Sequence, residues 1–114
     1  MNLLLVSFLL LISAVAIGFY LVYLGLHQRK RSPGLGLTHA GLALSGFIVL
    51  FIEIFTGPID KLNNVAGLLL FLAILGGGMV FALNEENKPP SMAAVTAHAI
   101  MGLVGISLLI INLF

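Results

Sequence analysis

Two histidines lie inside long apolar stretches of the sequence, and their surroundings match. His39 begins the segment His-Ala-Gly-Leu-Ala-Leu-Ser-Gly, and His98, 59 positions later, begins His-Ala-Ile-Met-Gly-Leu-Val-Gly. An imidazole can ligate a metal, carry a proton or exchange hydrogen bonds with a neighbouring helix. Because their surroundings match, we expect both imidazoles to have the same one of these functions. Small residues follow each histidine at the fourth and seventh positions, namely Ala43 and Gly46, and Gly102 and Gly105.

On a helix, the residues seven and fourteen positions after each histidine fall on the same face as the histidine. The reason is that each residue turns the helix by about 100°. Each such row of three residues starts with an imidazole, has no side chain at the central glycine and ends about 21 Å away in a polar group. The sequence therefore predicts room for a bulky group beside each histidine. The two rows, which we call stripes, are His39, Gly46 and Glu53, and His98, Gly105 and Asn112.

The composition indicates that the bilayer is the solvent of this chain. Of its 114 residues, 61% are hydrophobic and 8% are charged, whereas a soluble domain carries about 25% charged residues. A net charge of +1 provides no basic surface for nucleic acid, and we expect no nucleic-acid partner. The absence of cysteine excludes disulfides, thiolate nucleophiles and iron–sulfur sites. Any chemistry must use histidine, carboxylates and the backbone.

Four apolar runs predict four transmembrane helices, each near the roughly 20 residues that cross the hydrocarbon. The polar links between them are short, so we predict an all-α integral membrane protein with an up-down-up-down bundle. The 59-residue offset also brings Gly18 onto Gly77, which predicts two repeated helical hairpins within one domain, residues 1–114. The predicted spans are residues 3–26, 35–55, 62–83 and 92–114.

Positive charges are distributed unevenly between the links. The first and third links hold Arg29, Lys30, Arg31 and Lys88, whereas the second holds Lys61. Because short loops rich in Lys and Arg stay in the cytoplasm, the first and third links are predicted to be cytoplasmic and both termini to lie outside. We expect the membrane to be a bacterial inner membrane.

Paired ligation of haem iron is the interpretation that uses both histidines at once. The repeat places His39 and His98 at similar depth on diagonal helices, where their nitrogens can approach a central metal from opposite sides. Haem b iron accepts an imidazole on each face, and small residues beside the ligands let the macrocycle approach the backbone. Zinc alone prefers three or four protein ligands, and the sequence offers no third. Hydrogen bonding between helices and a proton or ion pathway are the alternatives. The predicted cofactor-binding residues besides the two ligands are Ala43, Gly46, Gly102 and Gly105.

Polar residues near the predicted cytoplasmic interface are candidates for binding haem propionates. They are Arg31, Thr38 and Lys88, although a cationic link is also explained by its role in topology. His27 lies in the same link, where an interfacial polar residue needs no special function. Met101, one turn after His98, is a candidate axial thioether, with core packing as the alternative.

Glu53 is the one acidic residue inside a predicted span. Oxidation of a quinol releases protons that an interfacial carboxylate can accept, so Glu53 is a candidate proton or quinol group. The alternative is that its side chain simply reaches the interface, because carboxylates near the end of a span are tolerated.

With these features the sequence resembles small four-helix b-type membrane cytochromes, the cytochrome b561-like proteins and their minimal relatives. The resemblance covers the four-helix architecture of the whole chain, and its motif content lies in the segments at His39 and His98. It implies haem b held inside the bundle by axial histidines, and electron exchange with quinols, oxygen species or redox proteins, as in an electron carrier or oxidoreductase. Larger relatives often hold two haems through four histidines, and here only His39 and His98 match that role. A homodimer that pairs His39 of one chain with His98 of the other would hold two equivalent haems.

Three other functions remain open at this stage. A haem carrier would use the same two ligands with an exchangeable cofactor. A small dimeric proton-coupled transporter could use His39 and His98, although the small multidrug exporters of this size rely on a carboxylate in the first helix, and residues 3–26 carry no charge. A scaffold subunit would tolerate apolar residues at both histidine positions.

Overall fold

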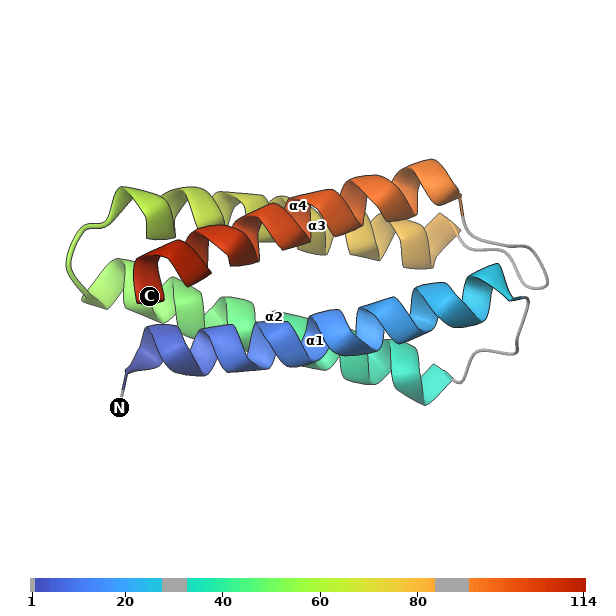
Figure 1. Cartoon of the computed structure of the whole chain (residues 1–114), viewed down its shortest axis with the longest axis horizontal. Helices are drawn as coiled ribbons and strands as arrows, with labels where there is room; N and C mark the ends of the chain where they lie inside the picture. The colour runs from blue at the N-terminus through green and yellow to red at the C-terminus, as the bar shows by residue number, and fades with distance from the viewer. Residues whose placement is uncertain (1, 28–32, 84–90) are drawn as a thin grey trace.

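The computed structural model describes residues 2–27, 33–83 and 91–114, and it is built from four long helices (Figure 1). Each of the four is long and apolar enough to cross a membrane. The prediction of an all-α chain with four membrane-length helices is therefore confirmed, with bounds within two residues of those predicted. The helices are α1 (Leu3–Leu26), α2 (Pro33–Thr56), α3 (Lys61–Leu83) and α4 (Met92–Leu113).

Polar side chains at the helix ends and on the helix surfaces are satisfied locally. The first backbone N–H groups of a helix have no intrahelical partner, and a side-chain oxygen that precedes the helix can accept from them. Proline, which lacks the N–H, begins α2. Hydroxyl groups on the exposed, apolar helix surfaces donate to the carbonyl four residues back, which satisfies them without water. The capping residues are Asn2 for α1, Asp60 for α3 and Ser91 for α4.

The helices pair into two antiparallel hairpins, α1 with α2 and α3 with α4. In the first hairpin the Ser7 hydroxyl donates to the Gly46 carbonyl at 2.7 Å, and farther along α1 the Ala14 carbonyl contacts His39. Residues later in α1 contact residues earlier in α2, so the two helices run in opposite directions. Side-chain contacts from Asn63 to Asn112 and from His98 to the Ala73 carbonyl give the same register in the second hairpin.

The internal packing of the first hairpin recurs in the second, 59 residues later. Gly46 lies so close to Leu11 that a Cβ atom on the glycine would be 2.7 Å from the leucine Cγ. A Cβ atom on Gly105 would likewise be 2.9 Å from Cγ of Leu70. These glycines let the two helices of each hairpin approach closely, as small residues do between membrane helices. The equivalent Leu50 and Leu109 are both fully buried.

The two hairpins meet chiefly in one half of the bundle. We call residues 2–14, 46–73 and 105–114 the terminal half, because it holds both chain ends (Figure 1). Phe47 and Phe71 join α2 to α3 there, and Phe8 and Phe114 join α1 to α4. The buried hydrophobic cluster also lies entirely in this half. Its members are Leu4, Leu11, Leu50, Ala66, Leu70, Ile106 and Leu109.

The other half of the bundle, the histidine half, is packed more openly. Among the described residues 15–27, 33–45, 74–82 and 91–104, only Leu24 is buried. The diagonal helices α2 and α4 make no close backbone contact within the described chain. The core that holds the hairpins together therefore ends at the level where the histidine half begins.

The close contact at Gly46 predicts a steric effect that an open glycine does not share. We expect Gly46→Ala to lower the free energy of unfolding by about 1–3 kcal/mol, because the new methyl group overlaps Leu11. Gly41→Ala, with nothing within 4 Å of the place that its methyl group would take, should leave stability unchanged or raise it by up to about 1 kcal/mol. Reversible unfolding in mixed micelles measures both, and equal effects of the two substitutions would contradict the packing described.

Candidate functional site

Each of the two histidines within the membrane-length helices is hydrogen-bonded to the partner helix of its own hairpin. His39 Nδ1 lies 2.7 Å from the carbonyl oxygen of Ala14, and His98 Nδ1 lies 2.6 Å from that of Ala73. Both bonds span 25 residues, and their four participants are related by the 59-residue offset. The hydrogen bond therefore belongs to the repeated hairpin rather than to one copy of it.

These contacts fix the tautomer of both imidazoles. A carbonyl oxygen can only accept, so Nδ1 of His39 and of His98 must carry the hydrogen and donate it. In a neutral imidazole Nε2 then keeps its lone pair. No fully buried side-chain nitrogen or oxygen in the described chain lacks a hydrogen-bond partner. The Nε2 atoms of His39 and His98 make no hydrogen bond within it, so they are not fully enclosed by the protein.

Two glycines make space for the rings. A Cβ atom on Gly18 would lie 2.9 Å from Cε1 of His39, and one on Gly77 would lie 2.8 Å from Cε1 of His98. Such distances are shorter than real Cβ contacts, so a larger residue at either position would push the ring away from its carbonyl. Sequence reasoning aligned Gly18 with Gly77 but assigned them no role, because their contact with the rings depends on the register of the hairpins.

The two rings meet across the bundle. Their centroids are 6.0 Å apart, and the ring planes are inclined by 80°. Since α2 and α4 are diagonal, the contact between His39 and His98 connects the two hairpins across the centre of the bundle. Both remain partly exposed, in keeping with the open packing of the histidine half.

The four small residues predicted to line a cofactor lie at different places. Gly46 and Gly105 are buried against Leu11 and Leu70, so the space that the sequence predicted beside these glycines is filled by side chains of the same hairpin. Gly102 lies in ordinary contact with Ala73, whose carbonyl accepts from His98, and Ala43 is partly exposed. The described residues of the histidine half are, apart from Leu24, intermediate or exposed. The close approach of leucine follows from helix packing and could not be read from the stripe of small residues.

The remaining candidates of the histidine half are dispersed. Thr38 is exposed and donates its hydroxyl to the Gly34 carbonyl, while Arg31 and Lys88 lie outside the described residues. His27 is exposed, and its Nδ1 lies 2.9 Å from the carbonyl of Tyr23 in its own helix. Neither Thr38 nor His27 makes a contact that joins it to the paired histidines.

Met101 lies beside the second histidine on α4. A Cβ atom on Gly76 would be 3.5 Å from its methyl carbon and 3.8 Å from Cβ of His98. Met101 therefore fills space between α3 and α4, which is the packing role that the sequence offered as the alternative to axial ligation.

The described residues provide no complete metal site from side chains alone. No group of three or more His, Cys, Asp or Glu residues in them could hold a metal ion.

Comparison with known proteins adds no family assignment. Family models, curated protein sequences and solved structures were searched, and none matches this chain. The resemblance to b-type cytochromes consequently rests on the residues themselves.

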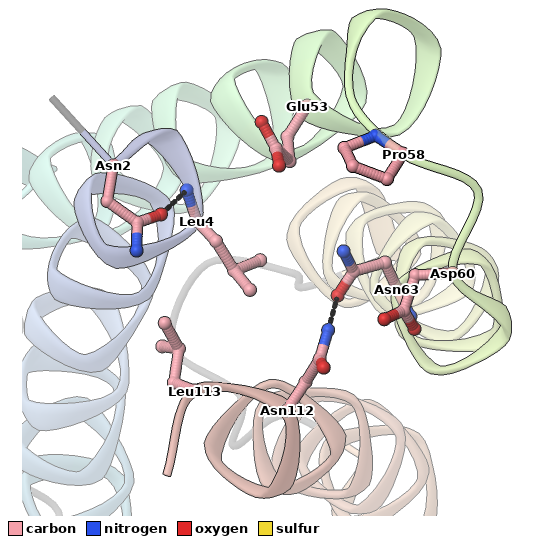
Figure 2. Close-up of a pocket in the computed structure, with 8 residues that line it drawn as sticks. All are labelled: Asn2, Leu4, Glu53, Pro58, Asp60, Asn63, Asn112 and Leu113. Carbon is pink, nitrogen blue, oxygen red and sulfur yellow. Dashed lines mark hydrogen bonds between the residues drawn. The ribbon is translucent and has the colours of Figure 1, made fainter.

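A second polar site lies at the opposite end of the bundle, in the terminal half (Figure 2). It is a pocket of about 260 Å³ between the ends of the four helices. Asn112 donates from Nδ2 to Oδ1 of the buried Asn63 at 2.7 Å. Glu53 points into the same pocket from α2. The pocket is lined by Asn2, Leu4, Glu53, Pro58, Asp60, Asn63, Asn112 and Leu113.

The asparagine pair predicts a measurable coupling between α3 and α4. Asn63 is 6% exposed, so Asn112→Leu should leave a buried oxygen without its donor and destabilise the protein. In a double-mutant cycle with Asn63→Leu we expect a coupling of about 0.6 kcal/mol, the average for hydrogen bonds between membrane helices, and at most about 1.7 kcal/mol. Strictly additive effects of the two substitutions on unfolding would show that the pair does not stabilise the fold.

Proposed function

We propose that this protein is a membrane haem b protein in which His39 and His98 are the two axial ligands, and that it transfers electrons. The observation that carries the proposal is the pair of imidazole rings, which meet edge to face across the bundle with centroids 6.0 Å apart. Two ligands suffice for haem iron because the macrocycle supplies the other four nitrogens. The lack of a third protein ligand among the described residues agrees with this ligand set.

The separation of the rings fits a shared metal. Metal–imidazole bonds are about 2 Å long, so a metal between two imidazole nitrogens requires ring centroids roughly 6 Å apart. The tautomer also fits, since Nδ1–H of each ring donates to a backbone carbonyl and Nε2 keeps the lone pair that a metal needs.

The surrounding residues supply orientation and space. The carbonyls of Ala14 and Ala73 hold each ring in one orientation and increase the basicity of its free nitrogen. Gly18 and Gly77 allow the rings to lie against the neighbouring helices. The histidine half, with Leu24 as its one buried described residue, has the looser interior that a flat group between the hairpins needs.

Electron transfer suits this ligand set better than oxygen binding. Haem iron with two axial histidines has no open coordination position, so it exchanges single electrons. Quinols or redox proteins of the membrane are the partner classes that we propose. The carbonyl-anchored ligands favour a resident cofactor over an exchangeable one, because such anchoring strengthens metal binding. Both ligands come from one chain, so the site needs no exchange of histidines between protomers.

A proton pathway from the histidines to Glu53 is supported less well. The buried residues between these levels are mainly those of the hydrophobic cluster, in which Leu50 and Leu109 are fully buried, and the buried Ser7 hydroxyl is bonded to the Gly46 carbonyl. A transported proton needs a chain of polar groups or water, and this apolar layer provides none among the described side chains.

The haem proposal predicts the spectrum of the purified protein. Detergent-purified protein should show the sharp reduced bands of a six-coordinate b-type haem at about one haem per chain. His39→Ala and His98→Ala should each lose this spectrum, while the variant chains still insert because insertion follows apolar length.

His27→Ala is the matched control, since His27 is exposed and bonded within its own helix. It should retain the full haem complement. Retention of the full complement by both His39→Ala and His98→Ala would rule out this assignment of the ligands.

We further propose that the protein lies in a bacterial inner membrane with both termini outside. The support is the excess of Lys and Arg in the links at the histidine end. The chain has no cysteine, so single cysteines can report the sidedness of each end. Asn64→Cys, at an exposed position of the terminal half, should react with an impermeant thiol reagent in intact spheroplasts, and Met92→Cys should react only after lysis. The reverse pattern would invert the proposed orientation.

A further inference from the structure

The pocket of the terminal half occurs where the two hairpins stop being alike. The histidine–alanine and glycine–leucine contacts of the first hairpin recur 59 residues later. At this end of the bundle, however, Leu4 and Glu53 stand where the second hairpin has Asn63 and Asn112. The two asparagines satisfy each other. Glu53 faces a buried leucine instead, and no side-chain hydrogen bond to its carboxylate is found within the described chain. The first hairpin therefore presents an unpaired carboxylate to the pocket.

Most of the other polar atoms around the pocket are already engaged. Oδ1 of Asn2 accepts from the start of α1, and Oδ1 of Asp60 accepts from the start of α3. Oδ1 of Asn63 accepts from Asn112. The side-chain acceptors left for a ligand are the Glu53 carboxylate, Oδ1 of Asn112 and Oδ2 of Asp60, on residues that all line the pocket (Figure 2).

The charge of the lining favours a cation. Two of the eight lining residues are acidic, Glu53 and Asp60, and none is basic. Glu53 and Asn112 also lie in the last turns of α2 and α4, where the helix dipole is negative. The positive ends of α1 and α3 are covered by the capping oxygens of Asn2 and Asp60. The electrostatic field in the pocket is therefore that of an acceptor-rich, negative site.

The shape of the pocket favours an organic cation over a bare metal ion. Calcium takes six to eight oxygen ligands, and too few free oxygens line this pocket. Its volume of about 260 Å³ exceeds that of an ion, and Leu4, Pro58 and Leu113 provide an apolar wall. A primary ammonium group, which has three N–H donors on a short carbon chain, matches both the free acceptors and the wall.

We propose that this pocket binds a primary ammonium group, which donates hydrogen bonds to the Glu53 carboxylate and to Oδ1 of Asn112. The pocket opens at an end of the four membrane-length helices, so the ammonium can belong to an ethanolamine lipid headgroup or to a soluble amine. The proposal is independent of haem, because the leucine core separates this pocket from the paired histidines.

The test uses the full-length protein in nanodiscs and two sources of the same ammonium chemistry. In discs of phosphatidylcholine alone, soluble ethanolamine is titrated and its binding is followed by ligand-observed NMR, with choline, which has no N–H donor, as the matched probe. In discs of mixed phosphatidylethanolamine and phosphatidylcholine, native mass spectrometry measures the enrichment of the ethanolamine lipid on the protein. Glu53→Gln, which removes the charge but keeps the shape of the side chain, should weaken ethanolamine binding or lipid enrichment by about tenfold or more.

Two further variants separate loss of binding from loss of fold. Leu4→Asn combined with Glu53→Asn copies the satisfied amide pair of the second hairpin, so it should fold and lose ammonium binding. Asn64→Gln, at an exposed position of the same end outside the pocket lining, should bind as the wild type does.

The outcomes distinguish the sources. Binding of soluble ethanolamine supports a soluble amine, and enrichment of the ethanolamine lipid without such binding supports a headgroup. Absence of both responses overturns the proposal. The proposal also fails if Glu53→Gln binds ethanolamine as tightly as the wild type does, or if the wild type binds choline as tightly as ethanolamine. The haem spectrum of each variant is recorded in parallel, so failure of the haem assignment and failure of this proposal are told apart.

Discussion

The hydrogen bond from each imidazole to an alanine carbonyl of the neighbouring helix is the contact on which the centre of this protein depends. In hydrocarbon an unpaired imidazole N–H is costly, and the partner must come from the protein. The carbonyls of Ala14 and Ala73 are that partner because their second lone pair remains free in a helix. The bond joins the two helices of each hairpin, sets the tautomer of the ring and leaves Nε2 without the hydrogen. Gly18 and Gly77 follow from it, since a larger residue would displace the rings.

The buried core that stabilises the bundle and the proposed ligand site lie in different halves of the bundle. The terminal half contains the leucine cluster and the contacts between aromatic residues of different hairpins. The histidine half has almost no buried residue among those described. A bundle packed evenly along its length would have no space for a prosthetic group, whereas one anchored at a single end can hold its hairpins together and still admit one. The two halves thus have different physical tasks, and the glycines at positions 46 and 105 belong to the first of them.

The elements and the repeat could be predicted from the sequence because they depend on local properties. Apolar length determines the four spans, and the match of residues around His39 and His98 reveals the duplication. The site itself was predictable only in part. That the rings would pair was inferred from helix order. The alanine carbonyls that accept from them could not be predicted, because every residue has a backbone carbonyl. The stripe through Gly46 and Gly105 indicated space, yet leucines of the adjacent helix fill it. The asparagine pair was missed as well, since Asn63 stands at the very start of its helix and only the register brings Asn112 to it.

The agreement between the two hairpins bears on how such a chain can arise. Each hairpin has an imidazole hydrogen-bonded to an alanine carbonyl and a leucine packed against a glycine, and the equivalent residues are 59 positions apart. A single hairpin that pairs with a copy of itself would reproduce the central pair with true twofold symmetry. Joining two copies in one gene keeps that symmetry where both halves must match, at the histidines. It also allows the copies to differ where matching is not required, as they do at the equivalent positions of Glu53 and Asn112.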